Sequence, residues 1–218
     1  MELITKGNTA EIYAYENNLI CKLFFSGYAT EFVNHEFHNA SLVYKLGVKT
    51  PKAYKTVSIE GRDGIVYDYI IGEELSHKVF NATETSFDMW MKNFADFHKE
   101  LLKHNADDAM NYKDFLKMFA AGEATIDKID ALADGNCLIH GDYHLSNVMV
   151  DEDNNLVLID MMNICRGPAL YDVARTYFLL NYDKRIQKKY LELMGYSLED
   201  ITPYLEVITA IRDKELGK

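Results

Sequence analysis

The chain has 218 residues, of which 48% are hydrophobic and 26% are charged, and this composition excludes a wholly disordered protein. Its length is sufficient for one large domain or for two small lobes with a real core. The 23 basic and 34 acidic residues give a net charge of −11. An acidic surface disfavours nucleic acid, whose phosphates it repels. It is compatible both with a cationic small substrate and with simple solubility.

The cysteines and the apolar segments indicate the cellular compartment in which the protein is expected. Cys21, Cys137 and Cys165 are odd in number, widely spaced and flanked by apolar residues, which is typical of buried small side chains. The N-terminus has no signal-peptide pattern, and no apolar run approaches the roughly 18 residues that a membrane span needs. We therefore expect a reduced, cytoplasmic protein with no membrane partner, and the oligomeric state stays open.

Strand signals dominate the first 70 residues. The segments AEIYAYE and LICKLFF are separated by Asn17 and Asn18, which predicts a hairpin. Residues 31–47 predict a helix that ends at Gly47. Residues 52–71 predict two strands around a Gly-Arg-Asp-Gly turn.

From about residue 84 the hydrophobic pattern becomes helical, except for short strands at 138–160. The first expected helix, 86–104, carries Phe87, Met91, Phe94 and His98 at helical spacing; the others are 112–133, 170–194 and 198–215. This order predicts an α+β protein with two lobes. Residues 1–71 are expected to form the β-rich lobe with one main helix. Residues 72–218 are expected to form a mostly helical lobe that carries a β-hairpin, with the boundary at Gly72.

Two charged residues stand on apolar faces. Lys22 lies in the middle of LICKLFF, and an ammonium buried there needs a carboxylate or an anion. Glu36 shares a helical stripe with Phe32, Ala40 and Val43. Each charge alone could face solvent, but together they predict an inward ion pair. Such a pair can direct a lysine toward phosphate oxygens.

A short turn at residues 7–10 (GNTA) lies between the first two strand segments. It could cover a phosphate, and Thr9 is its candidate nucleotide contact. The turn lacks the GxGxxG pattern, so as a glycine-rich loop it is a weak signal.

The polar stretch HGDYHLSN, residues 140–147, precedes a hairpin formed by VMV, the turn DEDNN and LVLID. Asn147 and Asp160 are equidistant from the hairpin centre, so antiparallel pairing predicts that they lie side by side. Asp142 lies in the loop at the same end. Asn147 and Asp160 could hold Mg²⁺, and Asp142 could orient an attacking hydroxyl.

This loop has two other possible interpretations. His140, Asp142 and His144 could be alternating ligands in a zinc hydrolase, but no further histidine cluster supports such a site. A capped polar turn would leave the symmetry of Asn147 and Asp160 unexplained.

The block HGDYHLSNVMV…LVLID resembles the HGDxxxxN…(I/V)D signature of the aminoglycoside phosphotransferase and choline kinase family, which has the protein-kinase-like fold. ICKLF resembles the strand with the nucleotide-binding lysine, and NHEFHNASLVYKLGVKTPK the helix with its glutamate. GIVYDYIIGEEL resembles the interlobe hinge, and GPALYDVART the segment after the metal-binding aspartate. The resemblance extends from about residue 3 to residue 180.

This resemblance implies the principal site residues. Asp142 is expected to be the catalytic base or orienting residue, and Asn147 and Asp160 the magnesium ligands. Lys22 is expected to contact the α- and β-phosphates and to pair with Glu36.

The same resemblance assigns supporting roles to further residues. The backbone of Asp68 and Ile70 would meet the adenine edge, with Tyr67 behind it. His140 and His144 would have structural roles, and Asp172 would anchor the catalytic loop by accepting backbone hydrogen bonds.

We therefore expect a kinase that uses ATP or GTP with Mg²⁺ to phosphorylate a hydroxyl group of a small molecule. A kinase acting on a protein or a lipid-linked sugar, and a non-catalytic nucleotide-binding module, are the alternatives. A group of acidic residues could attract an amine acceptor or could simply be solvated helix faces. This group consists of Asp88, Asp96, Asp107, Asp108, Asp114 and Glu123.

Overall fold

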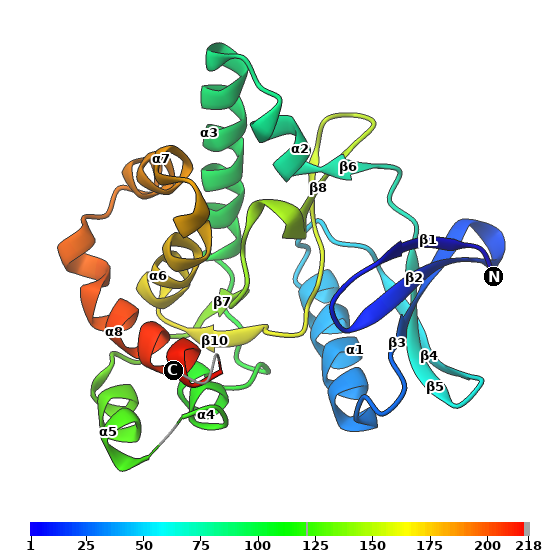
Figure 1. Ribbon diagram of the computed structural model, residues 1–218, viewed down its shortest axis with the longest axis horizontal. Helices are drawn as coiled ribbons and strands as arrows, with labels where there is room; N and C mark the ends of the chain where they lie inside the picture. The colour runs from blue at the N-terminus through cyan, green and yellow to red at the C-terminus, as the bar shows by residue number, and fades with distance from the viewer. Residues whose placement is uncertain (121, 216–218) are drawn as a thin grey trace. The chain divides into compact units, whose positions relative to one another are not determined.

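A computed structural model of the protein describes residues 1–120 and 122–215 (Figure 1). The chain forms two compact units. The first contains Met1–Glu73 and Met149–Met162, and the second contains Glu74–Val148 and the residues from Asn163 onward. The segment 149–162, which the sequence division assigns to the second lobe, thus belongs to the first unit. The lobe boundary at Gly72 stays a prediction.

The first unit is built on a five-stranded antiparallel sheet with the order β1-β2-β3-β5-β4. Its strands are β1 (Leu3–Lys6), β2 (Ala10–Tyr15), β3 (Leu19–Phe24), β4 (Ala53–Ile59) and β5 (Arg62–Asp68). Helix α1 (Thr30–Lys45) packs against β4 and β5. A second sheet has the order β6-β8-β9, with β6 (Gly72–Glu74), β8 (Val148–Asp151) and β9 (Leu156–Leu158).

The predicted hairpin between β2 and β3 is present. A short 3₁₀ turn (Glu16–Asn18) connects the two strands, and Asn17 and Asn18 have φ angles of 55° and 60°. Asparagine tolerates this left-handed conformation better than most residues. The sequence therefore placed this turn correctly from residue type alone.

The turn between β4 and β5 differs from the prediction. Glu60 and Gly61 form it, with φ angles of 52° and 75°, and Arg62 already begins β5. A two-residue turn with both φ angles positive matches the twist of an antiparallel pair. Asp63 and Gly64 therefore pair with β4 instead of turning.

The predicted stripe on α1 is only partly buried. Glu36, Ala40 and Val43 are buried, whereas Phe32 is 43% exposed. Phe32 lies in the first turn of the helix, where it contacts the ring of Tyr28 with centroids 6.0 Å apart.

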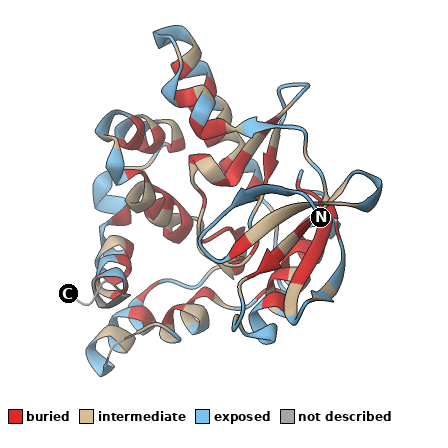
Figure 2. Cartoon of the chain, turned by 45° about the vertical axis from the view of Figure 1, so that its right-hand side comes forward, coloured by how far each residue is buried: buried red, intermediate tan, exposed pale blue. Residues whose placement is uncertain are grey.

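The second unit is mostly helical. Its helices are α2 (Leu75–Phe80), α3 (Glu84–Leu101), α4 (Tyr112–Lys117), α5 (Glu123–Ala131), α6 (Ala169–Leu179), α7 (Lys184–Met194) and α8 (Leu198–Glu215). Helix α3 packs on α7, and α6 packs on α8. The helices bury one side and expose the other (Figure 2), as amphipathic segments do. A short antiparallel pair, β7 (Cys137–Ile139) with β10 (Cys165–Gly167), completes the unit.

Two expected helices are each divided, and strand β10 was not predicted. The segment 112–133 contains α4 and α5, and Gly122 before α5 has a φ of 76°, which a helix cannot contain. The segment 170–194 contains α6 and α7. Asp183 begins α7 by accepting hydrogen bonds from the backbone N–H groups of Arg185 and Ile186. Within the described ranges, no helix is long and apolar enough to cross a membrane.

Candidate active site

Lys22, Glu36 and Asp160 meet in the first unit. The Nζ atom of Lys22 lies 2.7 and 2.9 Å from the two carboxylate oxygens of Glu36 and 3.0 Å from Oδ1 of Asp160. The Lys22 side chain is 13% exposed, that of Glu36 is 1% exposed, and that of Asp160 is 42% exposed. The structure thus contains the predicted ion pair and adds the second carboxylate.

The charge of Lys22 is stabilised by this cluster. Burial lowers the pKa of the ammonium, but Glu36 and Asp160 together outweigh burial and raise the pKa above its ordinary value. The Tyr67 hydroxyl donates a 3.0 Å hydrogen bond to Oε1 of Glu36. Lys22 is therefore a permanent cation at the edge of a buried polar network.

Asp160 has an unusual backbone conformation. It follows β9 with a φ of 65°, a left-handed value that is uncommon outside glycine and is often found at functional positions. This conformation accompanies the contact between its carboxylate and Lys22.

The remaining candidate nucleotide contacts lie elsewhere in the same unit. Thr9 lies in the turn between β1 and β2, where its carbonyl accepts a hydrogen bond from Phe25 N. The Asp68 carboxylate accepts hydrogen bonds from Lys52 N and the Tyr54 hydroxyl. These bonds anchor the end of β5, just before Ile70.

Asp172 anchors the HGDYHLSN loop in the second unit. The carboxylate, on α6, accepts 2.8 Å hydrogen bonds from the backbone N–H groups of His140 and Gly141. Gly141 has a φ of 72°, and a Cβ atom there would lie 2.6 Å from the Asn163 carbonyl oxygen. The loop therefore requires both the carboxylate and the glycine, which supports the anchoring role predicted for Asp172.

Asp142 is surrounded by groups that favour its ionised form. The Asn147 amide donates to its carbonyl and carboxylate oxygens at 2.9 and 3.2 Å. His144 Nε2 lies 3.6 Å from Oδ2, and an Arg175 nitrogen lies 3.9 Å from Oδ1. Burial raises the pKa of Asp142, but His144, His140 and Arg175 outweigh it, and the pKa is below its ordinary value.

The two histidines of the loop contact the protein itself. His140 is fully buried and faces the ring of Tyr143 edge-on. The Nδ1 atom of His144 accepts a hydrogen bond from Ser146 N. Among the described residues, no group of three or more His, Cys, Asp or Glu side chains is arranged to hold a metal ion. The structural roles of both histidines stay a prediction.

The chemistry of the predicted magnesium ligands fits that ion. Asp160 offers a partly exposed carboxylate. The side-chain nitrogen of Asn147 donates to Asp142, so the side-chain amide oxygen of Asn147 is the atom that could bind a cation. Oxygen donors of this kind suit Mg²⁺. Asn147 and Asp160 belong to different compact units, so their juxtaposition stays a prediction.

Sequence reasoning missed Arg175 and the part played by His98. Arg175 Nε donates a 3.1 Å hydrogen bond to the Gly141 carbonyl, next to Asp142. His98 is fully buried, and its ring contacts Asp172 at 3.0 Å and the Tyr190 hydroxyl at 2.7 Å. His98 was noticeable as the polar member of an apolar stripe, whereas Arg175 had no comparable signal.

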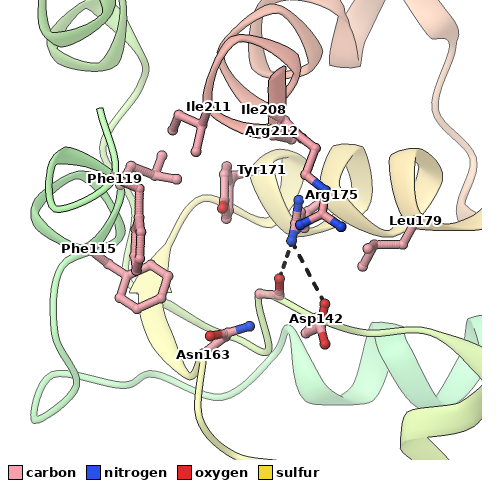
Figure 3. Close-up of a pocket in the computed structure, with 12 residues that line it drawn as sticks. Phe115, Phe119, Asp142, Asn163, Tyr171, Arg175, Leu179, Ile208, Ile211 and Arg212 are labelled. Atoms are coloured by element: carbon pink, nitrogen blue, oxygen red, sulfur yellow. Dashed lines mark hydrogen bonds and ion pairs between the residues drawn. The ribbon is translucent and has the colours of Figure 1, made fainter. Parts of the chain in front are cut away.

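A pocket of about 390 Å³ in the second unit is lined by Asp142 and Arg175 (Figure 3). Its other walls come from α4 and the segment after it, from α6 and from α8. The proposed catalytic carboxylate therefore borders a cavity that could hold a small molecule.

Comparison with known proteins places the chain in a family. Its residues 1–200 match the model of the phosphotransferase enzyme family, and the chain belongs to that family. A search of curated proteins found no match. The predicted family and the predicted phosphotransferase class are thereby confirmed.

Solved structures of this class share the fold. An aminoglycoside-3'-phosphotransferase of type VIII has a TM-score of 0.71 and 15% identity, over 96% of this chain and 91% of that chain. The aminoglycoside phosphotransferase APH(3'')-Id from Streptomyces rimosus, solved with ADP and streptomycin, has a TM-score of 0.67 and 13% identity, over 96% and 92%. Choline kinase LicA from Streptococcus pneumoniae has a TM-score of 0.61 and 18% identity, over 100% and 86%. The predicted α+β, protein-kinase-like fold is confirmed.

Proposed function

We propose that the protein transfers the γ-phosphate of ATP, or of GTP, to a hydroxyl group of a small molecule. The observation that carries this proposal is the position of Asp142. Its carboxylate has a lowered pKa and borders a pocket of about 390 Å³, where a hydroxyl could approach it. Asp142 is the proposed catalytic residue.

Lys22 is the proposed phosphate contact. Two carboxylates keep its ammonium charged, and the buried Glu36 fixes its direction. A cation held in this way can stabilise phosphate oxygens without reorganising during the reaction. Similar folds were solved with ADP or ATP bound, which supports a nucleotide as the phosphate donor.

Asn147 and Asp160 would hold Mg²⁺, which neutralises negative charge on the phosphates when it is bound. Thr9 and the backbone of Asp68 and Ile70 are the proposed further contacts to the nucleotide. Tyr67 supports the site through Glu36, and its position behind the base remains part of the proposal.

The reaction needs positioning, stabilisation of the charge on the phosphates and one proton acceptor. The acceptor oxygen forms a bond to the γ-phosphorus while the bond from that phosphorus to the β,γ-bridging oxygen breaks. The hydroxyl proton passes to the Asp142 carboxylate, and the nucleoside diphosphate leaves.

The test compares Asp142→Asn with Asp153→Asn, a matched change in the exposed hairpin turn. Nucleotide affinity is measured with Mg²⁺ by titration, and turnover is measured on a panel of hydroxyl metabolites. Asp142→Asn should lower turnover by about 10² to 10⁴-fold while nucleotide affinity is retained. Asp153→Asn should leave both unchanged.

Three results would count against the proposal. Full turnover in Asp142→Asn would remove the role of that carboxylate. Nucleotide binding without transfer to any acceptor would favour a non-catalytic module. Transfer of phosphate to a protein or a lipid-linked sugar, but to no small molecule, would favour a kinase for macromolecular acceptors.

A further inference from the structure

The charges that line the pocket are opposite to the charge of the whole chain. Asp142 contributes one carboxylate, while Arg175 and Arg212 contribute two guanidinium groups. Among the described residues that form the wall, Asp142 is the only acid, and it is the proposed proton acceptor. The described wall therefore carries two guanidinium groups and one carboxylate in a protein with a net charge of −11.

The acidic residues that could attract an amine do not line this pocket. Asp88 pairs with Lys189 at 2.9 Å, and Asp96 pairs with Lys92. Neither they nor the other four acids of that group contribute to the described wall. A cationic acceptor would meet two guanidinium groups and would compete with Arg175 for Asp142.

Arg175 is held in place beside the reaction centre. Its Nε atom donates to the Gly141 carbonyl, and its guanidinium lies 5.9 Å from the centre of the Phe178 ring. Its Nε donor is used at Gly141 and one terminal nitrogen lies 3.9 Å from Asp142, and a guanidinium fork is suited to a carboxylate or a phosphate. The Arg212 side chain runs from α8 toward Arg175 in Figure 3.

The remaining walls are apolar. Phe115 and Phe119 come from α4 and the residues after it, Tyr171 comes from α6, and Ile208 and Ile211 come from α8. Aromatic and branched side chains favour a compact apolar body next to the charged groups.

We propose that the acceptor is an anionic hydroxyl compound with a compact apolar or aromatic body. Its anionic group binds Arg212 and Arg175, and its hydroxyl faces Asp142. This inference rests on the proposed phosphotransfer at Asp142. It reverses the cationic acceptor that the total charge suggested, because a ligand in a pocket responds to the nearest charges.

Three matched probes test whether the pocket prefers an anionic, a neutral or a cationic acceptor. Phenyllactate carries a carboxylate beside its hydroxyl, its diol analogue is neutral, and the corresponding amino alcohol is cationic. Binding of each is measured by titration calorimetry with the full chain and Mg-ADP present. Phenyllactate should bind about tenfold more tightly than the amino alcohol, with the diol between them, because charge-assisted hydrogen bonds favour the anion.

Arg212→Gln should weaken phenyllactate binding about tenfold and remove the preference among the probes. Arg185→Gln is the matched control, since Arg185 lies on α7, pairs with Glu84 and is not among the residues that line the pocket. Its probe affinities should equal those of the unmodified protein.

The outcomes separate this inference from the proposed function. Tighter binding of the amino alcohol, equal binding of all three probes, or no binding of any probe overturns the anionic acceptor. If Mg-ADP still binds in these cases, the proposed phosphotransfer is unaffected. Failure to bind Mg-ATP, Mg-GTP and Mg-ADP would count against the proposed function itself.

Discussion

Lys22 and Asp142 are charged residues that the protein holds in place by different means. Lys22 is clamped by two carboxylates, one of which is fully buried. Asp142 accepts a hydrogen bond from the Asn147 amide, and the nearby His144, His140 and Arg175 favour its charged form. In both cases neighbouring groups oppose the cost of burial and keep the charged form.

At the residue scale, Glu36→Gln should lower the affinity for Mg-ATP about tenfold. The neutral amide of the variant attracts the Lys22 ammonium less strongly than the carboxylate does, so Lys22 is less firmly held in position. Titration of the nucleotide measures this change. Glu31→Gln on the exposed side of the same helix is the control and should leave the affinity unchanged. Unaltered binding in Glu36→Gln would show that the position of Lys22 does not depend on this pair.

At the element scale, the β6-β8-β9 sheet depends on close backbone contact. A Cβ atom at Gly72 would lie 2.1 Å from the Val150 carbonyl oxygen. The Thr50 hydroxyl donates a 2.9 Å hydrogen bond to the Leu158 carbonyl, and Lys49 pairs with Asp151 at 2.7 Å. The close approach of the Val150 backbone therefore explains why residue 72 is a glycine, and the sequence alone does not reveal this contact.

Gly72→Ala should reduce the free energy of unfolding by about 3 kcal/mol, because β6 and β8 must separate to make room for the methyl group. Urea unfolding followed by circular dichroism measures the loss. Gly7→Ala is the matched control, since a Cβ atom there makes only an ordinary 3.6 Å contact with the Ala10 carbonyl oxygen. Equal stability of the two variants would show that the sheet adapts without cost.

At the scale of the whole molecule, Asp172 joins segments that are far apart in the sequence. Its carboxylate contacts His98 on α3 and the backbone of His140 and Gly141, while His98 also contacts Tyr190 on α7. Burial raises the pKa of Asp172, but these partners outweigh it, so the pKa is below the ordinary value of 3.8. The ionised carboxylate thus stabilises the folded chain at neutral pH.

Asp172→Asn should cost about 3 kcal/mol at neutral pH, because an amide nitrogen would face a backbone N–H group. Since the pKa of the folded state is depressed, this contribution is complete above pH ~5 and disappears as the pH falls through the folded-state pKa. The difference between variant and parent should therefore shrink in acid.

Fluorescence of Trp90, the single tryptophan, follows unfolding of the second unit. Asp88→Asn is the control, because an exposed ion pair contributes about 1 kcal/mol or less. A difference between Asp172→Asn and the parent that stayed constant down to pH 2 would contradict the proposed linkage.

Several features followed from local sequence because their signals are local. Asn17 and Asn18 identified a turn, a lysine in an apolar strand and a glutamate on an apolar helix face identified a pair, and periodicity identified α3 and α8. The helix break at Gly122, by contrast, depends on a backbone angle that periodicity does not report.

The sequence by itself determined the α+β class, the family signature and most of the candidate site residues, because each lies in a contiguous pattern. Only the tertiary structure decided that Asp160 shares Lys22 with Glu36, that His98 supports Asp172, and that Arg175 and Arg212 line the same pocket as Asp142. These facts depend on distances between residues that are up to 138 positions apart. Charge at a site is set by the few side chains within several ångströms, and total composition does not report which ones the fold brings there.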